Sequence, residues 1–167
     1  MRKLVLVGLM ALGACGGEER RQTVATADGS RAEVTTHDDG GAATLNLTGA
    51  NGEQASFTAG DSARWPNDWP DFAPAYPGAK VQASMGGTSK DGKGGMVSFT
   101  TGDSAEKVIA FYRARAEAAG IRVVTTTEAG GSRQFSATDD TSKRSLSVSA
   151  TSEDGATQVA VVAGMKQ

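Results

Sequence analysis

Short segments in which apolar and polar residues alternate, divided by turn-forming residues, constrain this chain more than any other feature. The clearest is SLSVSAT at 145–151, where Leu146, Val148 and Ala150 share one side and the serines take the other. Because successive side chains of a β-strand point to opposite faces, a period of two predicts strands with one apolar face. Asp-Gly and Asn-Gly pairs between segments supply the positive φ of tight hairpins. The chain is therefore predicted to consist mainly of antiparallel hairpins.

One segment, residues 103–120, departs from this alternation and predicts a helix. Asp103 is expected to cap its first turn and Gly120 to end it. Its apolar residues recur at helical spacing and form one stripe: Ala105, Val108, Ile109, Tyr112, Ala116 and Ala119. Two alternating segments precede the helix and four follow it. Residues 80–167 are thus predicted to be an α+β domain of order β-β-α-β-β-β-β, with the helix on one face of an antiparallel sheet.

Residues 23–63 form a second group of alternating segments, which is poor in large apolar side chains. The apolar side chains that share a face are Ala32, Val34, Ala43, Leu45, Leu47, Ala55 and Phe57. A few strands with one weak apolar face are barely stable alone. This small β meander is therefore expected to dock on the rest of the protein.

Between the two groups, residues 64–79 (RWPNDWPDFAPAYPGA) hold both tryptophans and all four prolines. Three of the prolines recur at every fourth position, which excludes a helix interior or a central strand. Two interpretations of the aromatic residues are open. They form a strip that binds a peptide, a glycan or a partner protein, or they form a packed joint that clamps the meander onto the sheet. The scarcity of other large side chains favours the joint. The residues concerned are Trp65, Trp69, Phe72 and Tyr76.

The first fourteen residues have the pattern of a signal peptide, with Arg2 and Lys3 before a short apolar run. The run is shorter than the ~20 apolar residues that span a bilayer as a helix. Leu12-Gly13-Ala14-Cys15 resembles the lipobox of bacterial lipoproteins. The resemblance implies that residues 1–14 are removed, that the Cys15 thiol carries lipid, and that residues 15–22 are a flexible tether. Glycine at position 16 implies, by the same resemblance, an outer-membrane anchor facing the periplasm.

The globular part carries weaker indications of class and partners. Two motifs, YPGA at 76–79 and FYRARAEAAG at 111–120, resemble small uncharacterised bacterial lipoproteins, a likeness that implies no activity. The formal net charge of -2 excludes the basic footprint of a nucleic-acid-binding protein. The expected partners are the membrane, through lipid on Cys15, and an envelope protein or cell-wall component.

Side chains suited to catalysis or metal binding are scarce. His37, the only histidine, lies beside Asp38 and Asp39 in the turn-like HDDGG. With one histidine and one cysteine, no tight zinc or copper site is predicted, and no cofactor is expected. The loop GTSKDGKG at 87–94 has Gly94 where a phosphate-binding loop needs Ser or Thr, and it leads into a strand, so it is interpreted as a hairpin.

These observations favour a non-enzymatic, lipid-anchored envelope protein that serves as an accessory or binding module. Two alternatives remain open. One is a small envelope hydrolase that uses His37 or a pair of carboxylates. The other is a carrier of a small apolar ligand held between the helix and the sheet.

Overall fold

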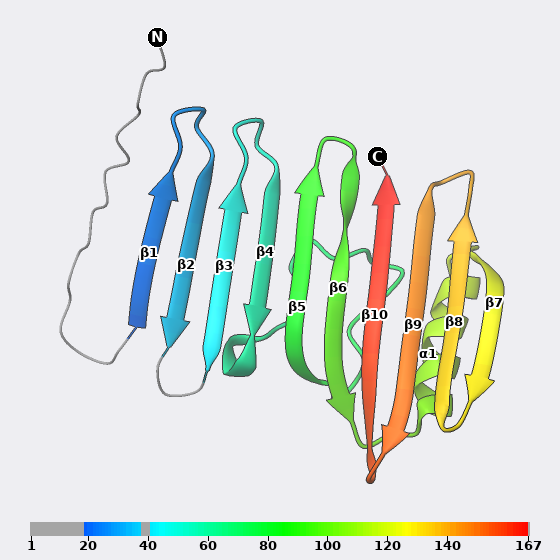
Figure 1. The fold of residues 1–167 in the computed structure, drawn as a ribbon. Helices are drawn as coiled ribbons and strands as arrows, with labels where there is room; N and C mark the ends of the chain where they lie inside the picture. The colour runs from blue at the N-terminus through cyan, green and yellow to red at the C-terminus, as the bar shows by residue number, and fades with distance from the viewer. Residues whose placement is uncertain (1–18, 38–40, 167) are drawn as a thin grey trace.

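A computed structural model describes residues 19–37 and 41–166, which form one antiparallel sheet and one α-helix, α1, Ala105–Ala118 (Figure 1). A short 3-10 turn, Gly60–Ser62, follows the fourth strand. The strands are β1 Glu19–Ala25, β2 Arg31–His37, β3 Ala42–Thr48, β4 Gln54–Ala59, β5 Lys80–Ser89, β6 Gly92–Thr101, β7 Arg122–Ala129, β8 Ser132–Asp139, β9 Arg144–Glu153 and β10 Ala156–Lys166.

All ten strands belong to a single sheet in the order β1-β2-β3-β4-β5-β6-β10-β9-β8-β7. The predicted class, an antiparallel α+β fold with one helix on the sheet, is confirmed. The strands predicted for the meander are present as β2, β3 and β4, but they do not form a separate sheet, because β4 pairs with β5 and so continues the main sheet through backbone hydrogen bonds. Strand β1 also begins at Glu19, so residues 19–22, expected as part of the tether, pair with β2. The polar composition of β1 hid this strand.

Helix α1 packs against β7, β8 and β9 and closes the main core. Its apolar stripe is the predicted one, with Val108, Tyr112 and Ala116 fully buried. The cap differs from expectation: the Ser104 side chain accepts a hydrogen bond from the Lys107 backbone N–H. Asp103 is one residue too early for that role and binds other partners.

The apolar side of the sheet changes face between β5 and β6. One row of directly paired residues lies on the face that carries α1, here called the helix face. It reads Thr35, Thr44, Thr58 and Ser84, then Val97, Val161, Val148 and Phe135. The adjacent row, on the opposite or open face, reads Val34, Leu45, Phe57, Met85, Met96 and Val162, then Ser147 and Ser136. The apolar residues of the meander therefore point away from the helix.

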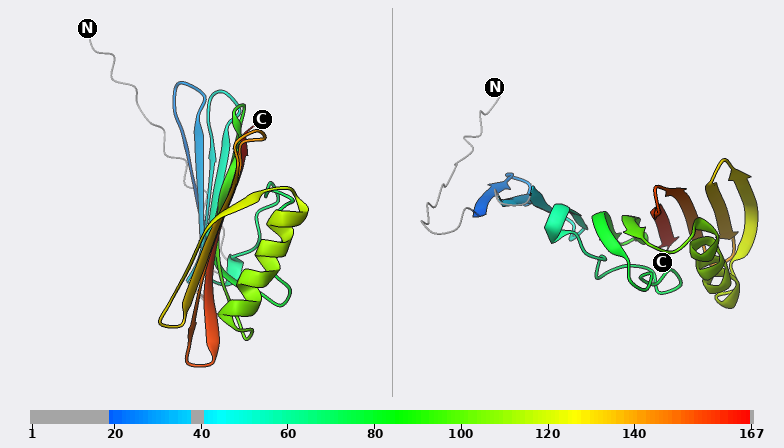
Figure 2. Two further views of the ribbon diagram at one scale, coloured as in Figure 1. Left: turned by 90° about the vertical axis from the view of Figure 1, so that its right-hand side faces the viewer. Right: turned by 90° about the horizontal axis from the view of Figure 1, so that it is seen from below.

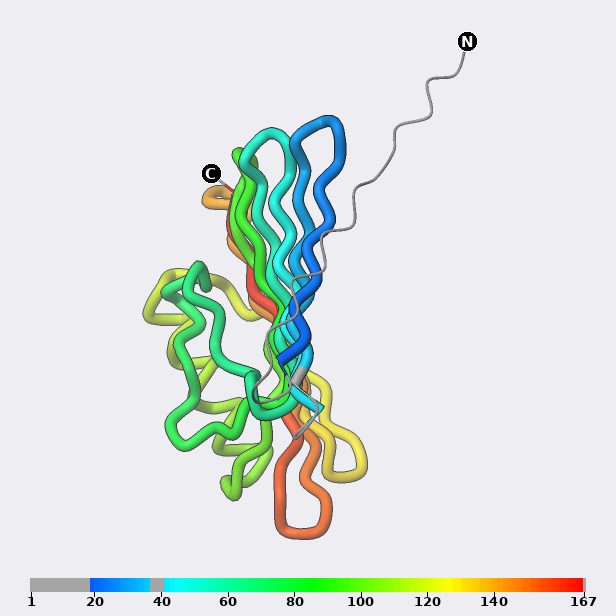
Figure 3. The backbone as a smooth tube through the Cα atoms, turned by 90° about the vertical axis from the view of Figure 1, so that its left-hand side faces the viewer, coloured from blue at the N-terminus to red at the C-terminus, as the bar shows by residue number. Residues whose placement is uncertain are grey.

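The segment from Gly60 to Ala79 crosses the helix face beside α1 (Figures 2 and 3). It lies closely on β5 at Gly86, where an added Cβ would be only 2.9 Å from the Pro66 side chain. Viewed from below in Figure 2, β1 to β3 extend beyond the helix and this segment as a single layer. Within residues 19–37 and 41–166, the sheet is thus covered on one face in its C-terminal half, and no other element lies on either face near β1.

Candidate functional site

The four aromatic residues of the 64–79 segment do not share one exposed surface. Trp69 and Tyr76 belong to the main core, with 6% and 4% of their surfaces exposed, whereas Trp65 and Phe72 are partly buried against it. The Trp69 indole N–H donates to the carbonyl of Ala73, and the Tyr76 ring stacks on Phe99 with centroids 5.7 Å apart. Most of the segment's aromatic surface is therefore used in packing against β6 and α1.

Tyr76 also ties this segment to the start of α1. Its hydroxyl donates to Asp103 Oδ2 at 2.7 Å, and Lys107 Nζ lies 2.8 Å from the other carboxylate oxygen. Burial, with a contribution from the Asp103 hydrogen bond, raises the pKa of Tyr76 to about 12. The hydrogen bonds from Lys107 and Tyr76 lower the pKa of Asp103. The position that the sequence assigned to a helix cap thus links the joint to the helix.

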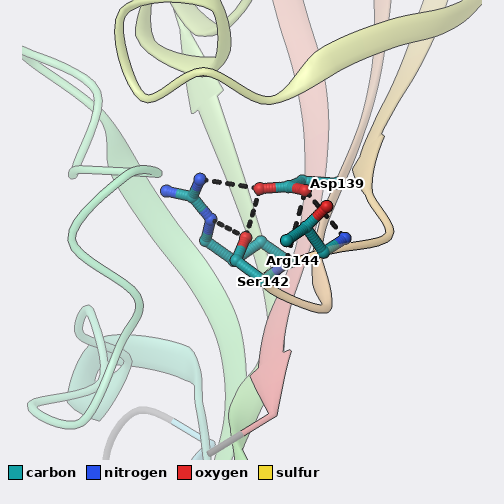
Figure 4. A network of polar contacts seen from close by, with 4 residues as sticks. Asp139, Ser142 and Arg144 are labelled. Carbon is teal, nitrogen blue, oxygen red and sulfur yellow. Dashed lines mark hydrogen bonds and ion pairs between the residues drawn. The ribbon is translucent and has the colours of Figure 1, made fainter.

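A second link runs from Phe72 to the turn between β8 and β9. The Arg144 guanidinium lies 6.0 Å from the centre of the Phe72 ring, and its Nη2 is 2.9 Å from Asp139 Oδ2 (Figure 4). The Ser142 hydroxyl and the backbone N–H groups of Thr141 and Ser142 also donate to Asp139. These hydrogen bonds lower the pKa of Asp139, and the bond from the Ser142 side chain has the largest effect. The carboxylate is therefore engaged within its own turn.

A groove of about 500 Å³ lies beside this joint, on the helix face of the meander. Residues 64–68 form one wall, and strands β3, β4 and β5 form the floor. The floor is rich in hydroxyl and amide groups because the polar side of the meander faces this way. Its polar members are Thr44, Asn46, Thr48, Gln54, Ser56, Thr58, Ser84 and Thr88. The groove thus combines many neutral donors and acceptors with Arg64 and Asp68 on its wall.

Trp65 joins the groove to the core. Its ring lies 5.7 Å from the Trp69 ring and 5.9 Å from the Phe99 ring, centroid to centroid, and it also lines the groove. The indole N–H is buried and has no acceptor among residues 19–37 and 41–166. A buried donor without a partner is costly. The Trp65 ring therefore offers a flat apolar surface at the groove, while its indole N–H lies buried without an acceptor among the described residues.

The groove is held in shape by hydrogen bonds between its wall and floor. The Ser84 hydroxyl donates to the Arg64 carbonyl at 2.7 Å, and the hydroxyl groups of Thr58 and Ser84 are 2.8 Å apart. Both side chains are buried beneath the segment. Their bonds fix the position at which residues 64–68 leave the sheet, and so the width of the groove.

The remaining predicted site residues are less informative. His37 ends β2, where it pairs with Glu19 and Ala42 through the strand register, while Asp38, Asp39 and Cys15 lie outside the described residues. No group of three or more His, Cys, Asp or Glu side chains suited to a metal ion occurs in the described ranges. No helix in the described part of the chain has the length and apolar character needed to cross a bilayer.

Sequence reasoning missed the groove, although its parts were visible. The alternation placed Asn46, Ser56 and Thr58 on the polar side of the meander, but it could not show which side faces residues 64–68. The useful signal was the position of Trp65 at the start of the proline-rich segment, directly after the meander.

Comparison with known proteins adds one similarity. A family model described as START domain-like matches residues 81–157, less than half of the chain. The matched part runs from β5 into β10 and includes α1, whereas β1 to β4 and the proline-rich segment lie outside it. No curated protein and no solved structure matches this chain. Over its helix-covered half, the chain is therefore similar to START domain-like proteins.

Proposed function

We propose that this protein is a lipid-anchored binding module of the bacterial envelope, and that it holds a hydroxyl-rich ligand such as a glycan in the groove beneath Trp65. The observation that carries the proposal is the floor of hydroxyl and amide groups beside the partly buried Trp65 ring. The anchor rests on the lipobox-like sequence at Cys15.

The chemistry of the groove suits a sugar more than a charged or purely apolar molecule. Hydroxyl and amide side chains both donate and accept hydrogen bonds, as sugar hydroxyls do. The Trp65 ring adds a flat apolar surface, which favours ligands with one apolar and one polar side. The volume of about 500 Å³ is within the ~300–1,000 Å³ of ordinary ligand sites. A short segment of a polysaccharide has the right size and hydrogen-bonding capacity.

Similarity to START domain-like proteins supports ligand binding in general and favours a second candidate, the carrier of a small apolar ligand. The space between helix and sheet is the expected place for such a ligand. In this structure Tyr112, Phe135 and Val148 fill that space and have no exposed surface. A carrier would therefore require these side chains to move, whereas the groove is already open.

The proposal is tested by tryptophan fluorescence of the purified full chain. In Trp69→Phe, Trp65 is the only tryptophan, so a change in emission reports on the groove. Soluble cell-wall glycan fragments and neutral oligosaccharides are titrated in parallel with a fatty acid. We expect saturable quenching by a glycan and none by the fatty acid.

Matched variants distinguish groove binding from adsorption elsewhere. Asn46→Ala removes an exposed amide from the floor, and Asn51→Ala removes one from the β3–β4 turn outside the groove. We expect about tenfold weaker binding for Asn46→Ala, since one hydrogen bond is worth ~1.4 kcal/mol here, and no change for Asn51→Ala. Binding of the fatty acid alone would replace the glycan proposal with the carrier. A folded chain that binds none of these probes would remove both.

A further inference from the structure

The open face of the sheet carries a charge-free apolar surface that spans strands β2 to β6 and β10. Its central row consists of large side chains: Val34, Leu45, Phe57, Met85, Met96 and Val162. The side chains of the flanking rows are small, except for Leu47. These rows are Thr36, Ala43, Ala59, Ala83, Ser98 and Ala160 on one side, and Ala32, Leu47, Ala55, Gly87, Gly94 and Gly164 on the other. We call these three rows the apolar rows.

Much of this surface remains in contact with solvent. Met85 is 50% exposed and Val162 47% exposed, although both are large apolar side chains. With strands ~4.8 Å apart and alternate residues ~6.8 Å apart, the apolar rows cover roughly 600 Å². Contiguous apolar patches of that size on a soluble surface usually mark an interaction site.

We infer that the apolar rows form the interface between two copies of this chain. A face-to-face pair would bury about 1,200 Å² in total, the lower end of the range for specific protein interfaces. Two sheet faces stack ~10 Å apart when their side chains interdigitate. The pair would then have the layered core that the meander lacks in a single copy.

The shape of the apolar rows is complementary to a second copy of the same surface. The central row is a ridge, and the row of Gly87, Gly94 and Gly164 beside it lines a shallow depression of about 770 Å³. Consider a two-fold axis that lies between the two sheets, runs parallel to the rows and passes between the central row and the glycine row. Rotation about this axis places each strand opposite the same strand of the other copy and exchanges the positions of the two rows. Met85, Met96 and Val162 of each copy then lie over the three glycines of the other. Such a self-complementary patch is what a two-fold dimer requires.

Charge at the rim argues against a lipid bilayer as the occupant. Glu53 and Asp91 border the depression together with Lys93, Lys143 and Lys166, so the rim carries both signs. Anionic bilayers attract clusters of basic residues, and membrane-surface proteins enrich Trp and Tyr at the boundary. The apolar rows contain neither tryptophan nor tyrosine. A rim of mixed charge around an uncharged apolar centre is typical of a protein–protein interface.

Site-specific cross-linking of the full chain in bacterial cells tests the inference. The only native cysteine is Cys15, whose thiol is expected to carry lipid, so that Met85→Cys provides a single free thiol in the centre of the patch. Gln134→Cys is the matched control, an exposed residue on the same face in its polar half. With a bismaleimide we expect a covalent species of twice the chain mass, at least tenfold more abundant for Met85→Cys. Adding Val162→Lys to the Met85→Cys chain should reduce the amount of this cross-linked species to that of the Gln134→Cys control.

Several outcomes would overturn the dimer. Equal cross-linking of Met85→Cys and Gln134→Cys would show random collision. A protease-resistant Met85→Cys chain that stays single, although a monofunctional maleimide labels it fully, would show that the face is free. Absence of both labelling and dimer would show that something else, such as the bilayer, covers it. A cross-linked species of any other mass would identify a different protein partner. None of these readings depends on what the groove binds.

Discussion

The two halves of the sheet follow the same alternating pattern but use it in opposite directions. In β6 and β8 to β10 the apolar side faces α1 and builds a two-layer core. In β2 to β4 the apolar side faces away, and the side toward the proline-rich segment is polar. A periodic pattern therefore determines that a strand has an apolar face, while the element that covers the sheet determines whether that face is buried. The C-terminal half of the sheet buries its apolar face beneath α1, and the N-terminal half leaves its apolar face exposed.

The largest effect is expected from truncation in the enclosed half. Phe135 has no exposed surface and lies in the core beneath the helix. Phe135→Ala should lower the free energy of unfolding by ~4 kcal/mol, as for other large core truncations that leave a cavity. Urea denaturation followed by circular dichroism measures the loss. A change below about 1 kcal/mol would mean that the helix is not packed on the sheet as described.

The joint should respond almost as strongly. Trp69→Ala removes a buried ring and its hydrogen bond to Ala73, so a loss of ~3 kcal/mol or more is expected. Asp68→Ala changes the exposed residue next to it and is the control. An equal, small loss in both variants would indicate that the segment is a free binding strip and not a joint.

Alkaline pH should loosen the joint, because Tyr76 stays protonated in the folded chain up to a pKa of about 12, against an ordinary value near 10. A raised pKa adds stability that is complete below pH 10 and is lost as the pH rises toward 12. In Tyr76→Phe, the free energy of unfolding lost between pH 8 and pH 11 should be smaller by roughly 1 kcal/mol. The measurement is the urea midpoint between pH 8 and pH 11. Burial also raises the pKa of Tyr112, so part of the loss will persist in the variant; identical curves would exclude a role for Tyr76.

The smallest and most selective comparison uses one isosteric change in both halves. Val148 is fully buried, whereas Val34 is 37% exposed on the open face. Val148→Thr buries a hydroxyl and should cost ~1 kcal/mol or more, while Val34→Thr should stay within ~0.5 kcal/mol in dilute single copies. Equal costs, measured by thermal denaturation at low protein concentration, would contradict the difference between the halves.

The sequence predicted the strands, the helix and its buried stripe because each depends on local periodicity. It did not predict that β4 pairs with β5, since pairing at a strand edge depends on backbone groups that every sequence shares. The direction of the meander's apolar face was equally hidden. Alternation distinguishes the side of Leu45 from the side of Asn46 but not which of them meets residues 64–68.

The candidate site was predictable only in part. The aromatic residues were recognised, and Trp69 and Tyr76 lie in the packed positions that the joint interpretation requires. Tyr76 and Trp65 differ in their contacts. The Tyr76 hydroxyl reaches Asp103, while Trp65, near the start of the segment, borders the groove. Distances of this kind follow from the path of a proline-rich segment across the sheet, which residue types alone do not determine.

The position of β10 has a consequence for how the sheet is completed. This strand is the last in sequence among those described, yet it lies between β6 and β9 and is their only connection within the sheet. Residues up to 155 supply two strand groups, β1 to β6 and β7 to β9, and the neighbouring edges of both groups pair with β10 in the sheet. The sheet is therefore completed only when residues 156–166 are present, and the pairing of β10 with β6 joins distant parts of the sequence, a kind of contact that slows folding. The last strand of the described chain is thus the one that turns two groups of hairpins into a single sheet.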